Sequence, residues 1–198
     1  MTKINIIYIL LILLLLEVGC TQRVQNITVT KKIPRQEVFA CLPLIQQYEN
    51  EYFSIKFPLF WEYDESVEYV EGMEYESRTV DIALTGDSSI ILPTIHIVIS
   101  AFKLGNPLSD IAELARYFNS KKYDNYTCYE EYNAMISGYP SICIFQGYTN
   151  GNDTIIGKQF VVKKTDNTIV YITSRFNVTN YNWAQTLGDD IIRSFVIK

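Results

Sequence analysis

Several strand-like segments of this sequence carry apolar residues on both faces, and this pattern is the strongest constraint on the fold. Residues 94–102 read TIHIVISAF. Ile95 and Ile97 alternate along one face, while Val98 joins polar residues on the other. Residues 158–164, KQFVVKK, also direct apolar side chains both ways. Because a sheet of such strands would expose apolar surface on either face, we expect helices to cover it.

Turn signals divide the chain into short segments of strand or helix pattern. Asn106 and Pro107 open an amphipathic segment that reaches Phe118, and Asn180 is a candidate cap for a last helix. Successive strands are separated by turns, so the sheet should be mostly antiparallel. The expected strands are residues 53–57, 67–70, 78–84, 94–102, 126–135, 141–148, 155–163 and 168–173, and the expected helices are 106–118 and 181–193.

These elements predict a single α+β domain over residues 51–198, a mostly antiparallel β-sheet flanked by helices. A segment of about 150 residues is long enough to bury a core. Its aromatic residues are spread along the sequence, which is typical of a folded domain. Residues 20–50 have the character of a linker, with a short ordered piece around 38–48.

Residues 1–19 have the pattern of a secretory signal peptide. Their apolar run, residues 6–16, has 11 residues, fewer than the roughly 20 needed to span a bilayer. Gly19 and Cys20 follow, so the segment resembles a bacterial lipoprotein signal, although Glu17 stands where such signals usually have Leu. The resemblance implies that Cys20 becomes the mature N-terminus and carries lipid that holds the protein on a membrane. An ordinary signal peptide or an uncleaved short anchor is the alternative.

Charge is divided unevenly along the chain. Residues 21–35 hold four bases and no acid, whereas residues 36–198 hold 12 of the 17 bases and 21 of the 22 acids, a net charge of −9. A basic tether is attracted to an anionic lipid surface, and an acidic body is repelled by it. The acidic body argues against nucleic acid as a partner, because binding it requires a basic face.

Four phrases occur along the domain: FSIKFPLFW at 53–61, ISGYP at 136–140, KQFVV at 158–162 leading to YIT at 171–173, and SFVIK at 194–198. In this order and spacing they resemble the PsbP-like family, including its bacterial lipoprotein and DcrB-type members. The resemblance implies an antiparallel sheet with helices on its faces and a domain that is mainly non-catalytic. No motif for manganese, Ran or photosystem binding has a matching position here.

The sequence lacks the residue patterns that would favour an enzyme. His96 is the only histidine, and its neighbours Ile95 and Ile97 favour a packed or edge position on a strand. No serine nucleophile elbow, Gly-rich phosphate loop or paired-cysteine motif occurs. We therefore expect no catalytic residue, no metal and no cofactor. A metal-dependent hydrolase that uses His96 is the least favoured alternative.

Residues 62–76 form the sharpest charge feature, with seven acids, three interleaved tyrosines and no base. One interpretation is a patch for a basic partner or a weak divalent-cation site, although the spacing does not match an EF-hand loop. The other is a solvated edge hairpin that its charge protects from further pairing. The acids are Glu62, Asp64, Glu65, Glu68, Glu71, Glu74 and Glu76.

Tyrosines and cysteines complete the set of candidate residues. Regular alternation would place Tyr126 and Tyr132 on one strand face and Tyr129 on the other. These tyrosines would either pack in the core and at the sheet edge or form a binding surface.

A tight hairpin about residues 137–140 would hold Cys128 and Cys143 too far apart for a disulfide. The sequence leaves open whether Cys41 forms a disulfide with one of these cysteines.

These features predict a lipid-anchored protein of the cell envelope, with the inner or outer membrane left open. Its partners would be the membrane, through lipid on Cys20, and another envelope protein. The domain would act as a non-catalytic binding or accessory module. A protective role, such as immunity to a toxin or exclusion of phage, is the alternative.

Overall fold

The computed structural model describes residues 43–59, 61–69, 76–84, 94–103 and 105–198. This part of the chain forms two α-helices, a short 3-10 helix and two groups of strands. The elements are β1 (Leu44–Glu49), β2 (Phe53–Pro58), β3 (Trp61–Tyr69), β4 (Glu76–Leu84), β5 (Thr94–Lys103), α3 (Leu108–Lys122), β6 (Asp124–Ile136), β7 (Tyr139–Asn150), β8 (Asp153–Lys163), β9 (Thr168–Asn177), η2 (Val178–Asn180), α4 (Tyr181–Arg193) and β10 (Val196–Ile197).

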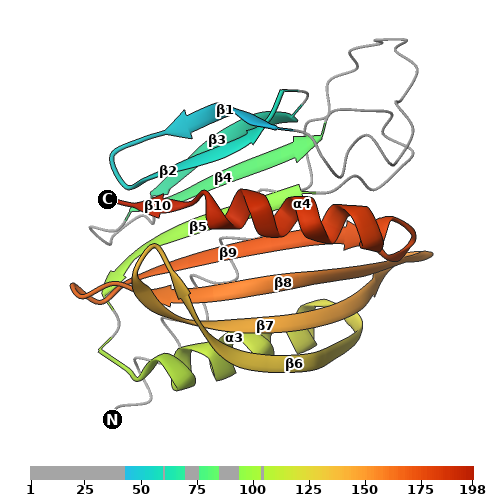
Figure 1. The fold of residues 1–198 in the computed structure, drawn as a ribbon. Helices are drawn as coiled ribbons and strands as arrows, with labels where there is room; N and C mark the ends of the chain where they lie inside the picture. The colour runs from blue at the N-terminus through green and yellow to red at the C-terminus, as the bar shows by residue number, and fades with distance from the viewer. Residues whose placement is uncertain (1–42, 60, 70–75, 85–93, 104) are drawn as a thin grey trace.

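Seven strands form a large sheet in the order β3-β4-β5-β9-β8-β7-β6, and each neighbouring pair is antiparallel. Strands β3 to β5 are one run of sequential neighbours and β6 to β9 are another, with α3 in the connection between them (Figure 1). The runs join where β5 pairs with β9. A small antiparallel sheet has the order β1-β2-β10.

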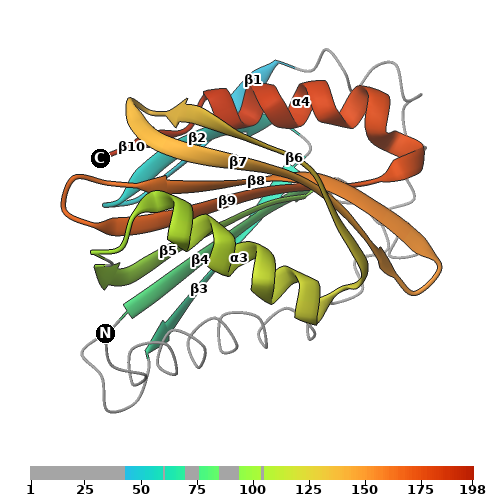
Figure 2. The same ribbon diagram turned by 90° about the horizontal axis from the view of Figure 1, so that it is seen from below.

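The two helices lie on opposite faces of the large sheet (Figure 2). We call the side under α3 the α3 face, and the side that packs against α4 and the small sheet the α4 face. The layers confirm the predicted α+β class, with a mostly antiparallel sheet flanked by helices. The two-sided apolar pattern of β5 has the expected cause, because Ile95 and Ile97 face the α4 side while Val98 packs under α3.

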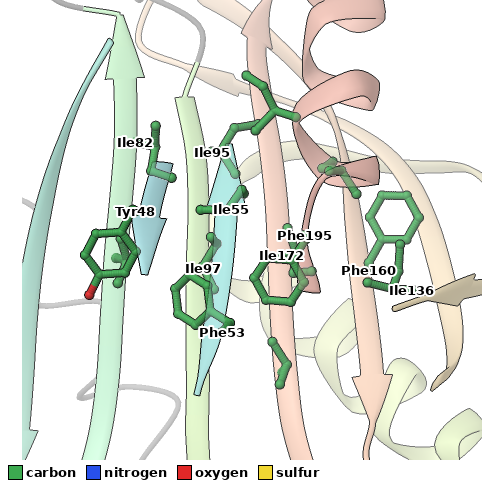
Figure 3. Packing of buried hydrophobic residues seen from close by; sticks show 14 of the residues in the cluster. Tyr48, Phe53, Ile55, Ile82, Ile95, Ile97, Ile136, Phe160, Ile172 and Phe195 are labelled. Carbon is green, nitrogen blue, oxygen red and sulfur yellow. The ribbon is translucent and has the colours of Figure 1, made fainter. Parts of the chain in front are cut away.

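The main core fills the α4 face (Figure 3). Alternate residues of β2, Phe53, Ile55 and Phe57, point into it from the small sheet. Phe195, just after α4, packs its ring against Phe53 with 4.9 Å between the ring centres. Burying side chains of this size contributes about 1.5–3 kcal/mol each, so this core holds the two sheets together.

A second core lies under α3. Ile111, Ala112 and Ala115 form the buried stripe of that helix, and they pack on Ile144 and Val161 of the large sheet. Their spacing follows the helical repeat, which is why the apolar pattern predicted this helix. The helix continues past residue 118 to Lys122, and Asn119 on its last turns is also buried.

Three strands differ from the sequence-based expectation: β1, β3 and β10, of which β10 was not expected at all. β1 lies within the segment assigned to the linker, where a short ordered piece was expected around 38–48, and it buries Tyr48 in the main core. Folded structure therefore reaches back to Leu44, before the boundary drawn at residue 51. β3 begins at Trp61 instead of residue 67, because pairing with β4 extends through its charged residues. In the described part of the chain, no helix is long and apolar enough to cross a membrane.

Candidate functional site

A row of polar side chains crosses the α3 face in direct register. Asp64 on β3 lies opposite Asp81 on β4, which lies opposite His96 on β5. His96 lies opposite Thr173 on β9, and Thr173 lies opposite Gln159 on β8. The row thus runs from the outer strand β3 to the part of the face beneath α3.

His96 and Asp81 form a close cross-strand pair. The Nδ1 atom of His96 lies 2.6 Å from Oδ1 of Asp81, and the two side chains are 11% and 36% exposed. Because an ionised carboxylate only accepts hydrogen bonds, the imidazole Nδ1–H donates. The expected packed histidine is confirmed. Asp81 was not singled out in the sequence, because the register between β4 and β5 depends on the tertiary fold.

This pair links two neighbouring strands of the sheet. A His–Asp pair is also part of catalytic triads, in which the second ring nitrogen faces a nucleophile. Here the neighbour across from His96 is Thr173, which is only 3% exposed. Among the residues that the structure describes, no three His, Cys, Asp or Glu side chains are arranged to hold a metal ion. The pair ties β4 to β5.

The acidic residues of the predicted patch occupy the β3 edge of the sheet and the start of β4. Glu62 and Asp64 are exposed on the α3 face, whereas Glu65 is exposed on the opposite face. Glu68 and Glu76 belong to the β3–β4 ladder. Glu71 and Glu74 lie outside the described residues. The carboxylates of Glu62, Asp64 and Glu65 therefore lie on both faces of a strand edge and do not converge on one point.

Tyr63 fixes this edge to the small sheet. Its ring centre lies 4.8 Å from that of Tyr48 on β1 and 6.3 Å from that of Phe57 on β2. One side of the ring is thus packed, yet the residue keeps 54% of its surface exposed. Val67, two positions after Glu65 on the same face, is 36% exposed. The edge therefore alternates carboxylates with partly exposed apolar groups.

A buried amide cluster lies under α3, and the sequence analysis did not identify it. Asn119 Nδ2 donates to Oε1 of Gln146 at 3.0 Å and to Oε1 of Gln159 at 2.9 Å. The Tyr126 hydroxyl also donates to Gln146 Oε1, at 3.0 Å. Burial, with a smaller contribution from Cys128, raises the pKa of Tyr126 to about 12. These bonds fix the end of α3 on the sheet, as expected of a satisfied polar network.

The tyrosines of β6 do not follow the predicted alternation. Tyr126 points to the α3 face, but both Tyr129 and Tyr132 lie on the α4 face. The cause is a register shift between Cys128 and Glu130, which adds a residue and reverses the alternation. Tyr129 rests on Gly147, where an added Cβ would lie 2.5 Å from its hydroxyl oxygen.

Cys128 and Cys143 are free thiols on opposite faces of the sheet. Burial is the main cause that raises the pKa of the Cys143 thiol to about 11, and the nearby Tyr132 hydroxyl and Lys158 ammonium oppose it. The prediction that these two cysteines do not form a disulfide is confirmed. Cys41 and the lipidation candidate Cys20 lie outside the described residues.

Comparisons with known proteins identify the fold. No family model and no curated protein sequence matches the chain. The solution structure of the cyanobacterial PsbP protein CyanoP from Synechocystis sp. PCC 6803 matches with a TM-score of 0.54 and 11% identity, covering 77% of this chain and 92% of that chain. LpqN, involved in cell envelope biogenesis of Mycobacterium tuberculosis, matches with a TM-score of 0.52 and 13% identity, covering 74% and 83%.

A third structure, the protein of unknown function PA94 from Pseudomonas aeruginosa, matches with a TM-score of 0.51 and 10% identity, covering 75% of this chain and 94% of that chain. At these identities the likeness establishes the fold alone. The chain has a PsbP-like fold, so the resemblance drawn from its sequence phrases is confirmed at that level. The narrower relationship to DcrB-type proteins has no support from these matches.

Proposed function

We propose that this protein is a lipid-anchored lipoprotein of the cell envelope, and that its PsbP-like domain is a non-catalytic binding or accessory module for another envelope protein. The observation that carries the proposal is the signal-like segment of residues 1–19 followed by Cys20, which indicates export and a lipid anchor. The fold is shared with LpqN, a protein involved in envelope biogenesis, and this likeness supports the same location. The packed His96–Asp81 pair is consistent with a non-catalytic domain.

The anchor is tested by labelling expressing cells with a palmitate analogue. The full-length protein should take up the label and sediment with membranes. Cys20→Ala should abolish both, because one thiol is the expected site of lipid attachment. Cys41→Ala is the matched control and should retain label and membrane association. Label that persists in Cys20→Ala would contradict the anchor.

The binding role is tested with the full-length chain in envelope membranes. Chemical crosslinking should capture a defined protein, and added unlabelled full-length chain should compete it away. Saturable competition distinguishes a binding module from adventitious contact. A membrane-anchored protein that yields no competed crosslink at any expression level would contradict the accessory role.

A further inference from the structure

The two edge strands of the large sheet differ in regularity. β6 carries register shifts between Asp124 and Thr127 and between Cys128 and Glu130. β3 pairs with β4 one to one from Trp61 to Tyr69, without a shift. Bulges are a common way to stop an edge strand from pairing with another chain. Within the described residues, β3 lacks this protection.

The β3 edge is also accessible. All six residues from 62 to 67 are exposed. Among the described strands, β3 pairs only with β4. An edge strand presents alternate N–H and C=O groups to its open side, and these can form a ladder with an added strand. A regular, exposed strand of nine residues is long enough for such an addition.

Side-chain chemistry on both faces of β3 selects the strand that would be added. Glu62 and Asp64 present carboxylates on the α3 face. Tyr63 and Val67 supply apolar surface beside Glu65. A partner strand with lysine or arginine at alternate positions would place opposite charges side by side, whereas a second copy of β3 would oppose like charges.

We propose that the β3 edge binds an extended, basic segment of another protein, which adds as a further strand of the large sheet. This inference rests on the proposed binding function and names its surface and the chemistry of the partner. Main-chain hydrogen bonds would provide the pairing, and the carboxylates would provide the selection for a basic segment.

The probe is a synthetic peptide of the same length as β3 in which lysine alternates with valine, and the protein is the full-length chain in detergent. Binding is measured by fluorescence anisotropy of the labelled peptide. Hydrogen exchange should then slow at the backbone amides of residues 61–69 and remain unchanged over residues 124–136. A control peptide with glutamate in place of lysine should not bind. Protection on β6, or none on β3, would overturn the proposal.

Charge reversal on the edge gives the matched comparison. Glu62→Lys combined with Asp64→Lys should weaken peptide binding by about tenfold or more. Glu113→Lys with Asp124→Lys makes the same change in net charge at exposed positions on α3 and β6, and should weaken it much less. Equal losses in the two variants would show attraction to the whole acidic protein instead of the edge.

Crosslinking in envelope membranes separates this proposal from the function on which it rests. If both charge variants capture the envelope partner as wild type does, the β3 proposal is wrong and the accessory role stands. If the peptide protects β3 but no envelope partner is captured, the edge binds basic strands and the accessory role fails.

Discussion

The imidazole of His96 and the carboxylate of Asp81 meet on neighbouring strands, at the centre of a polar row. Asp64 extends the row but is exposed, so its carboxylate remains solvated. A hydrogen bond to a charged group that is partly buried contributes more than one at the surface. Removing the carboxylate of Asp81 should therefore lower the free energy of unfolding, whereas removing that of Asp64 should leave it nearly unchanged.

We predict that Asp81→Asn lowers the free energy of unfolding by about 1–2 kcal/mol. Loss of the charge weakens the bond to His96 Nδ1, whose position is partly buried. Urea unfolding measures the change, and a double-mutant cycle with His96→Gln isolates the coupling between the two side chains. The control Asp64→Asn should change stability by less than about 0.5 kcal/mol. A cycle without coupling would show that the pair does not link the strands.

The raised pKa of the Cys143 thiol leads to a prediction about stability in alkaline solution. Its pKa rises from 9.0 to about 11 on folding. As the pH rises between these values, the unfolded chain releases the thiol proton while the native protein keeps it. At this thiol the unfolded state then binds fewer protons, so the thiol's contribution to the free energy of unfolding should fall as the pH rises from 9 towards 11. Lys122, whose pKa is lowered by burial to about 8, contributes in the opposite direction, so the effect of the thiol is read from the difference between wild type and a Cys143 variant.

Urea titrations across this pH range measure the effect. Cys143→Ala should reduce the slope of stability against pH, since the variant lacks the titrating thiol. An unchanged slope would assign the alkaline loss to other groups. The tyrosine neighbour Tyr132 has a raised pKa, chiefly through burial, and acts in the same direction at still higher pH.

At the scale of single elements, two glycines on neighbouring strands test how closely the backbone is packed. A Cβ added to Gly157 would overlap the carbonyl oxygen of Ser174 on β9, and that backbone cannot move without breaking the ladder. A Cβ added to Gly147 would meet the ring of Tyr129, which is exposed and can turn aside.

We therefore predict that Gly157→Ala costs about 3 kcal/mol or more and Gly147→Ala about 1 kcal/mol. The substitution is the same in both cases, so differences in intrinsic strand propensity cancel. Thermal or urea unfolding of the two variants provides the comparison. Similar losses would mean that the close approach of β8 to β9 is not a constraint.

Elements with a clear hydrophobic repeat were predicted well. α4 occupies residues 181–193 as expected, and strand β5 has the predicted faces. Register and bulges were not predictable, because they depend on pairing between distant residues. The extra residue near Tyr129 reversed the faces of β6, and the charged residues of β3 hid a strand that pairing with β4 stabilises.

At the scale of the whole molecule, both sheets share one core. Phe53 and Ile55 of the small sheet pack with Ile97 of the large one, and Leu187 of α4 belongs to the same cluster. Neither sheet can lose this packing without exposing the apolar face of the other. We expect them to unfold together in one cooperative transition.

Two probes can test this cooperativity. Trp61 is 1% exposed in the main core, so its fluorescence reports on contact between the sheets; Trp183→Phe would leave it as the sole tryptophan. Circular dichroism reports mainly on the large sheet. The two urea transitions should coincide. A fluorescence change at lower urea would reveal separate release of the small sheet.

The interaction surface was only partly predictable at this scale. The sequence indicated an acidic segment and offered an edge hairpin as one of two interpretations, but it could not show the order of strands beyond that edge, which depends on the pairing of β5 with β9. Likewise, the sequence could not show that β6, at the other edge, carries bulges. The contrast between the edges emerges only from the assembled fold.

The chain order of the first three strands has a mechanical consequence. β1 is the first described strand, β2 pairs with it, and β3 follows β2 within a few residues. With the lipid anchor and the β3 partner as proposed, tension between membrane and partner would pass through the β1–β2 ladder and the short connection to β3. Strands β5 to β9 would lie outside this line of force. The protein could then act as a short mechanical link while most of its sheet carries no load.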